Sequence, residues 1–200
     1  FEPYINSLIQ IQEYKKASKI IKNFYKREKN PVILIELGNL YQTQGNSKLA
    51  TETFQAALKE AKKNKKFLPV VGSKFYKERL YSFALSAYLL AKEETKKPNY
   101  SIQIANIYSY LGDVDAMYKE LVDLINHHPN YFQTCKNILR RTISEDDTSE
   151  NNQKLKKIIL KYIQKKNKNL SKNWKTNILI EEINKKIPLN IKINKASINS

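Results

Sequence analysis

The chain has 200 residues and a formal net charge of +17, from 36 Lys and Arg against 19 Asp and Glu. Apolar residues make up 41% of it, and because no long apolar run occurs, the sequence predicts no membrane span. Its single cysteine excludes an intrachain disulfide, and the low content of 4 Gly and 6 Pro argues against a β-rich or loop-rich fold.

A pair of helices is predicted before Pro31. The inner stripe of a first helix is predicted to include Phe1, Tyr4, Ile5 and Leu8. That of a second helix is predicted to include Tyr14, Ala17, Ile21 and Phe24. The proline cannot continue a helix but is favoured at the start of one, so it marks where the next helix begins.

The clearest pattern follows this break. Leu34, Leu37, Gly38 and Tyr41 are spaced i, i+3, i+4 and i+7, which predicts one stripe of an α-helix. Gly38 has no Cβ, so a second helix can approach closely at this position.

The partner helix is predicted directly after a turn. Gly45 and Asn46 both tolerate a positive φ and allow the chain to reverse. We expect Ser47 to cap the second helix, whose inner stripe then includes Ala50 and Phe54.

This helical hairpin recurs along the chain. Its second-helix position is filled in turn by Ala17, Ala50, Ala84 and Met117, at intervals of 33 or 34 residues. The third hairpin has no glycine at its turn, so its turn is the least clearly defined.

The pattern Leu34-x₂-Leu37-Gly38-x₂-Tyr41, followed by Ala50-x₃-Phe54, resembles the tetratricopeptide repeat, with Leu in the Trp position. The chain is therefore similar to tetratricopeptide repeat proteins of the bacterial type, with about four recognisable repeats. The resemblance implies an all-α fold, a right-handed α-solenoid of antiparallel helix pairs.

The pattern loosens toward the C-terminus. We predict a repeat array over residues 1–143, an acidic polar loop over 144–152, degenerate repeat helices that continue the solenoid over 153–187, and an irregular or truncated tail over 188–200.

Few residues offer catalytic or metal-binding chemistry. His127 and His128 are adjacent at a predicted helix end, without ligand partners at metal-binding spacing. Cys135 fits a core position better than a nucleophile, and the acidic run 145–147 lacks the remainder of a calcium loop. We therefore expect a non-enzymatic protein without cofactor or metal.

The resemblance implies that first helices line a concave groove that binds a peptide or helix of another protein. A clamp for a terminal carboxylate is not expected, because Ile35 occupies the position where that clamp has Lys. The groove residues implied by the resemblance are Asn39, Gln42, Ser73, Tyr76, Lys77, Asn106, Tyr110, Lys136 and Arg140.

The positive charge leaves an alternative open, in which a Lys-rich surface binds RNA or another nucleic acid. Only four of the basic residues are Arg, the side chain best suited to phosphate recognition. The abundance of Lys, Asn and Ile equally fits A/T-rich codon usage.

A third possibility is that the chain supports a separate domain. The chain opens on Phe1 and shows no targeting segment, so we expect that its native N-terminus is missing. Its localisation and oligomeric state are left open.

Overall fold

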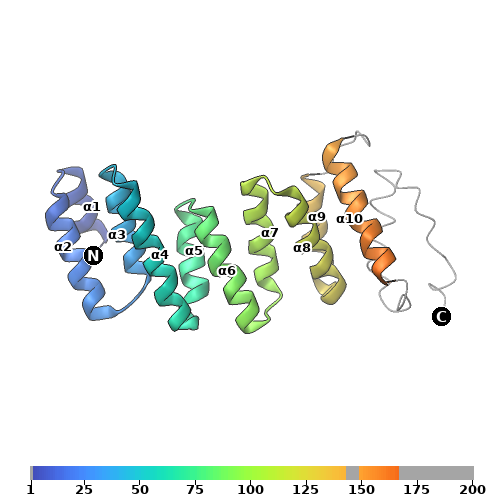
Figure 1. The fold of residues 1–200 in the computed structure, drawn as a ribbon, viewed down its shortest axis with the longest axis horizontal. Helices are drawn as coiled ribbons and strands as arrows, with labels where there is room; N and C mark the ends of the chain where they lie inside the picture. The colour runs from blue at the N-terminus through green and yellow to red at the C-terminus, as the bar shows by residue number, and fades with distance from the viewer. Residues whose placement is uncertain (1, 143–148, 167–200) are drawn as a thin grey trace. The chain divides into compact units, whose positions relative to one another are not determined.

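The computed structural model describes residues 2–142 and 149–166, and every regular element in this part is a helix. The all-α prediction is therefore confirmed. The chain divides into two compact units, Phe1–Lys97 and Pro98–Ser200. Within the described residues, each unit consists of helices that pack against one another (Figure 1). No helix in the described part has both the length and the apolar character needed to cross a membrane.

Unit 1 consists of three antiparallel helix pairs, each packed through apolar side chains. Its helices are α1 (Glu2–Gln10), α2 (Tyr14–Glu28), α3 (Val32–Thr43), α4 (Ser47–Lys63), α5 (Leu68–Lys77) and α6 (Tyr81–Thr95). A short 3₁₀ helix, Lys65–Phe67, leads into α5. Besides pairing with α4, α3 also contacts α2 and α5, so neighbouring pairs pack on one another within this unit.

The predicted first helix is present, with one exception in its inner stripe. Ile5 and Leu8 are buried at 5% and 3% exposure. Tyr4 is 52% exposed, so the prediction that it lies on the inner stripe was wrong. The helix packs against α2 through the face that carries Ile5 and Leu8, and Tyr4 lies outside that face.

The turns within the pairs α1–α2, α3–α4, α5–α6 and α7–α8 each contain one residue in the left-handed region. Gln12, Gly45 and Arg79 adopt this conformation in unit 1, and Gly112 adopts it in unit 2, with φ between 60° and 75°. Successive members are 33 or 34 residues apart, so the repeat seen in the side-chain pattern is also present in the backbone. The third turn follows the same geometry although Arg79 replaces the glycine.

The hydrogen bonds at these turns are also repeated. The residue after the left-handed one donates its N–H to a carbonyl five residues earlier, as in the bond from Asn46 to Tyr41 of 2.9 Å and that from Leu80 to Phe75 of 2.9 Å. This pairing satisfies a carbonyl that the end of the helix would otherwise leave free.

Asn46 forms hydrogen bonds at the end of one helix and at the beginning of the next. Its backbone N–H closes α3, and its side-chain oxygen accepts a hydrogen bond of 3.1 Å from the N–H of Leu49. The predicted cap, Ser47, is instead the first residue of α4, so that prediction was wrong by one position. Asp113 caps the equivalent helix of unit 2 by accepting from Ala116 N at 2.9 Å.

The close approach expected at Gly38 is present in the structure. A Cβ built on this residue would lie within 3.0 Å of three atoms of the Phe54 ring, which is too close for any side chain. Phe54 is 3% exposed and also contacts Phe75 and Phe83, with ring centroids 5.9 and 5.5 Å away. One ring therefore joins α3, α4, α5 and α6.

A glycine again faces an aromatic ring one repeat later, but with a less close contact. A Cβ on Gly72 would lie 3.2 Å from the Tyr88 ring, tight but not prohibitive. At the corresponding positions of unit 2, Ala105 and Leu121 are both fully buried in one cluster. A larger residue on the first helix is thus accompanied by a smaller one on the second.

Unit 2 has its own core, formed by α7 (Asn99–Leu111), α8 (Val114–His127), α9 (Phe132–Arg140) and α10 (Glu150–Lys166). Met117, Leu139 and Leu155 are among its buried residues. The hydroxyl of Tyr118 donates to Thr142 Oγ1 at 3.1 Å, and burial raises the pKa of Tyr118.

The segment predicted as a loop over 144–152 is partly helical, because α10 begins at Glu150. Asn152, in this first turn, is fully buried. Of the degenerate helices predicted over 153–187, residues 153–166 belong to α10, and the remainder lies outside the described residues together with the tail predicted over 188–200.

The Gly38 contact generates a stability prediction. Gly38→Ala should lower the free energy of unfolding by about 1–3 kcal/mol, because the new methyl group overlaps a ring that is held on several sides. Gly72→Ala should be close to neutral, because the gain in helix propensity of about 1 kcal/mol offsets its milder contact. Urea unfolding followed by circular dichroism measures both.

A double-mutant cycle tests the cause. Phe54→Leu makes room for the methyl group that Gly38→Ala adds. The double variant should therefore lose less free energy of unfolding than the two single variants lose together. If the two single losses in the free energy of unfolding simply add up in the double variant, the Gly38–Phe54 contact is not their cause.

The left-handed turns generate a second prediction. Arg79→Gly should raise the free energy of unfolding by about 1 kcal/mol, because glycine adopts this conformation without the cost that a side chain incurs. Gly45→Ala should lower it by a similar amount, since no atom lies near the added Cβ and only backbone strain acts.

Ser82→Gly provides the control, because it places glycine in the first turn of α6 and should lower the free energy of unfolding by about 0.5 kcal/mol. Thermal melts of the three variants distinguish the cases. A lower melting temperature for Arg79→Gly would show that this residue is not left-handed in solution.

Candidate functional site

The predicted groove residues of unit 1 lie on two helices that contact each other, α3 and α5. Asn39 is half-buried and Gln42 is exposed on α3. Ser73 and Tyr76 are half-buried on α5, and Lys77 is exposed. Amides and hydroxyls can both donate and accept hydrogen bonds, so this surface offers partners for both the N–H and C=O groups of a peptide backbone.

The aromatic member of this surface is oriented by a neighbour. The rings of Tyr76 and Tyr81 meet edge to face, with centroids 5.8 Å apart and planes at 66°. This contact joins α5 to the beginning of α6 and fixes the direction of the Tyr76 ring.

The predicted residues of unit 2 lie on α7 and α9. Asn106 is half-buried and Tyr110 is 60% exposed on α7. On α9, Lys136 Nζ lies 6.0 Å from the centre of the Phe132 ring, and Arg140 is exposed. The two cations are four residues apart and share one face of that helix.

An ion-pair network that the sequence pattern did not indicate connects α3 and α5. Lys74 Nζ forms ion pairs with Glu36 on α3 and with Glu78, the latter at 2.9 Å. Glu36 lies one helical turn before Asn39, and Lys74 follows Ser73, so the network lies beside the predicted groove residues. The Lys74–Glu78 spacing of i, i+4 could have been recognised in the sequence, whereas the pair between helices could not.

The network keeps Lys74 charged. Burial by itself lowers the pKa of Lys74, but hydrogen bonds from its ammonium to Glu36 and Glu78, together with their charges, outweigh this effect and raise that pKa. Its side chain is only 21% exposed, so these interactions are partly shielded from solvent.

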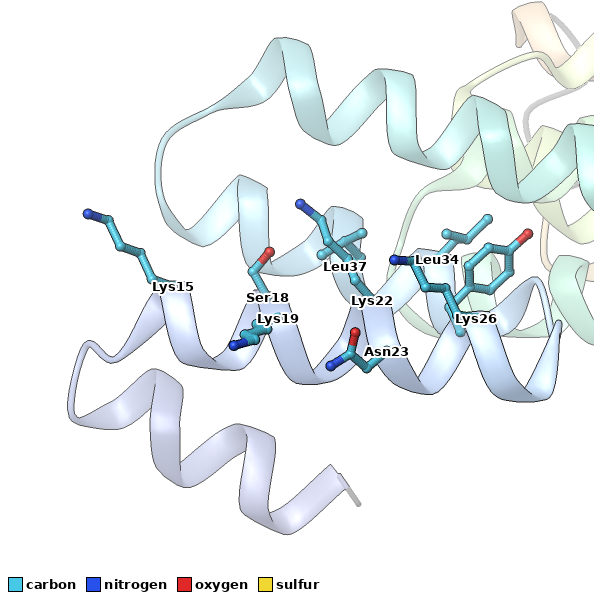
Figure 2. A pocket seen from close by; sticks show the side chains of 9 residues that line it. Lys15, Ser18, Lys19, Lys22, Asn23, Lys26, Leu34 and Leu37 are labelled. Atoms are coloured by element: carbon cyan, nitrogen blue, oxygen red, sulfur yellow. The ribbon is translucent and has the colours of Figure 1, made fainter.

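A second surface is found on α2, where a cavity of about 520 Å³ opens beside a row of lysines. Figure 2 shows the lysines along the helix and two leucines of α3 beside them. The cavity is lined by Lys15, Ser18, Lys19, Lys22, Asn23, Tyr25, Lys26, Leu34 and Leu37. The sequence carries the signal for this surface, because the four lysines recur at helical spacing, but its apolar floor depends on the packing of α3.

One lysine of the row also interacts with α3. Lys22 Nζ lies 5.7 Å from the centre of the Tyr41 ring. Burial by itself raises the pKa of Tyr41. Hydrogen bonds from Lys22 and Ser18, together with the charge of Lys22, outweigh this effect and lower the pKa of Tyr41 overall.

The residues considered for metal binding and catalysis have structural partners. His127 is the last residue of α8, and its Nδ1 lies 3.0 Å from the carbonyl oxygen of Asp123. Cys135 is fully buried, and burial raises the pKa of its thiol to about 12. Within residues 2–142 and 149–166, no three His, Cys, Asp or Glu side chains converge as a metal site.

Comparison with known proteins adds no identification, since neither a family model nor a curated protein matches this chain.

The network between α3 and α5 generates a third prediction. Lys74→Met should lower the free energy of unfolding at pH 7 by about 1–3 kcal/mol, because it leaves Glu36 half-buried without its cation. Lys77→Met, on the same helix but exposed, should change it by less than about 0.5 kcal/mol.

The effect should depend on pH. Because the pKa of Lys74 is raised above its ordinary value of 10.5, its contribution is fully present below pH 10.5 and is lost as pH rises through the folded-state pKa. The stability difference between wild type and Lys74→Met should therefore shrink in alkaline urea titrations. A constant difference up to and beyond that range would exclude the ion pairs as its cause.

Proposed function

We propose that this protein is a non-enzymatic interaction scaffold of the tetratricopeptide class, whose first helices bind a segment of a partner protein. The observation that carries the proposal is the recurrence of one hairpin geometry, with a left-handed residue every 33 or 34 residues. This interval matches the tetratricopeptide period, and the close helix approach at Gly38 matches its glycine position. On this proposal, each unit forms part of a right-handed solenoid.

The proposed working surface in unit 1 is the face of α3 and α5 that carries Asn39, Gln42, Ser73 and Tyr76. These polar side chains lie on adjacent helices and retain access to solvent. An extended segment that crosses both helices would meet amides and hydroxyls able to pair with its backbone. The Glu36–Lys74 pair holds the two helices together, so the surface is formed before the partner binds.

In unit 2 we propose a different role for the cations of α9. Lys136 and Arg140 share a helix face and can meet a carboxylate of a partner segment that binds this unit. Asn106 and Tyr110 on α7 supply further hydrogen-bonding groups. An acidic or amide-rich partner segment fits this composition best.

The fourth prediction tests the groove with matched variants. Gln42→Ala combined with Ser73→Ala should reduce the capture of partner proteins by the full chain, because it removes hydrogen-bonding groups from the proposed surface. Gln55→Ala combined with Ser82→Ala, on the second helices α4 and α6, should leave capture unchanged. Affinity capture with quantitative mass spectrometry compares the recovered proteins, and thermal melts verify folding.

The two pairs of substitutions are chemically identical, so only the surface differs. If both double variants recover the wild-type set of partners, the first-helix face is not the working surface. If both double variants lose partner proteins to the same extent, the loss of capture does not depend on the groove.

A further inference from the structure

The lysine-rimmed cavity on α2 is a surface distinct from the proposed groove. Lys15, Lys19, Lys22 and Lys26 lie on one face of this second helix, at intervals of three or four residues. All four are exposed, and they surround a cavity of about 520 Å³. The groove residues, by contrast, all lie on first helices.

No carboxylate lines this cavity. Other lysines of unit 1 lie in ion pairs, as Lys63 does with Glu60 at 2.6 Å and Lys65 does with Glu94. Like charges one helical turn apart repel each other. An anionic occupant would therefore relieve repulsion along α2 and gain charge-assisted hydrogen bonds from several ammonium groups.

The floor of the cavity selects among anionic partners. Leu34 and Leu37 of α3 line it with 8% and 5% of their surface exposed, so an occupant can add a small apolar contact to its charge pairs. The neighbouring Tyr41 ring is only 7% exposed and is approached by Lys22, so it offers no open face on which a base could stack. A phosphate backbone would meet the lysines but leave the leucine floor unused.

We propose that this cavity binds an acidic segment of a partner protein that inserts an apolar side chain against Leu34 and Leu37. Glutamates or aspartates on either side of this anchor pair with the lysines of α2. The site goes beyond the proposed groove function, because its lysines lie on the second helix α2 and its leucine floor adds an apolar anchor that the groove does not use. It gives the scaffold a second docking point.

The fifth prediction uses the full chain and a short fluorescein-labelled peptide in which glutamates flank two leucines. Fluorescence anisotropy should detect binding that weakens with added salt. Lys19→Glu combined with Lys26→Glu should weaken it at least about tenfold, because each change replaces an attractive charge with a repulsive one. Lys16→Glu combined with Lys62→Glu makes the same change in net charge outside the cavity lining and should have little effect.

Two further probes separate the cavity from general attraction. The same peptide with both leucines changed to serine should bind at least about tenfold more weakly, because it loses its apolar anchor. A single-stranded oligouridine RNA of similar length should bind more weakly than the leucine peptide. Circular dichroism melts confirm that each variant is folded.

Three results would overturn the proposal. Equal weakening by both pairs of charge reversals would assign binding to net charge alone. Equal affinity for the leucine and serine peptides would show that the cavity floor is not used. Tighter binding of the RNA, lost only in the Lys19→Glu and Lys26→Glu variant, would make this surface a nucleic-acid interface instead.

Discussion

The packing of unit 1 depends on the close contact between Gly38 and Phe54. Because glycine leaves no Cβ on α3, the aromatic ring of α4 lies directly against its backbone. From there the ring also reaches Phe75 and Phe83, so a single side chain couples two helix pairs. Gly72 with Tyr88, and Ala105 with Leu121, occupy the corresponding positions with different sizes. The combined volume of the two paired side chains is therefore constrained more strongly than the volume of either one alone.

The turns impose a second constraint, which acts on the backbone. The four turns from α1 to α2, α3 to α4, α5 to α6 and α7 to α8 all reverse through a left-handed residue, whether that residue is Gly45, Gly112, Gln12 or Arg79. The same hydrogen bonds close the helix in each case, so the geometry belongs to the turn and not to glycine. Residues with side chains adopt it at an energetic cost, which the packing of the helices on either side offsets.

The distribution of charge separates two kinds of surface in unit 1. Lys74 pairs with Glu36 and Glu78 and so connects α3 to α5 next to the polar residues of that surface. The lysines of α2 instead face a cavity with an apolar floor and no acidic lining. Net charge alone does not distinguish these roles, because both involve lysine on a helix. The difference lies in which neighbouring helix supplies a carboxylate and which supplies leucine.

The sequence by itself determined the helical hairpins, their 33- to 34-residue period and the close approach at Gly38, because these depend on local spacing and residue size. It also placed Asn39, Ser73 and Asn106 on first helices. It misplaced the cap at Ser47 by one residue and assigned Tyr4 to a buried stripe. Only the tertiary structure decided that Glu36 pairs with Lys74 and that Leu34 and Leu37 underlie the lysines of α2. Such contacts join residues that are distant in the chain, and helical periodicity states which face a residue occupies but not what packs against that face.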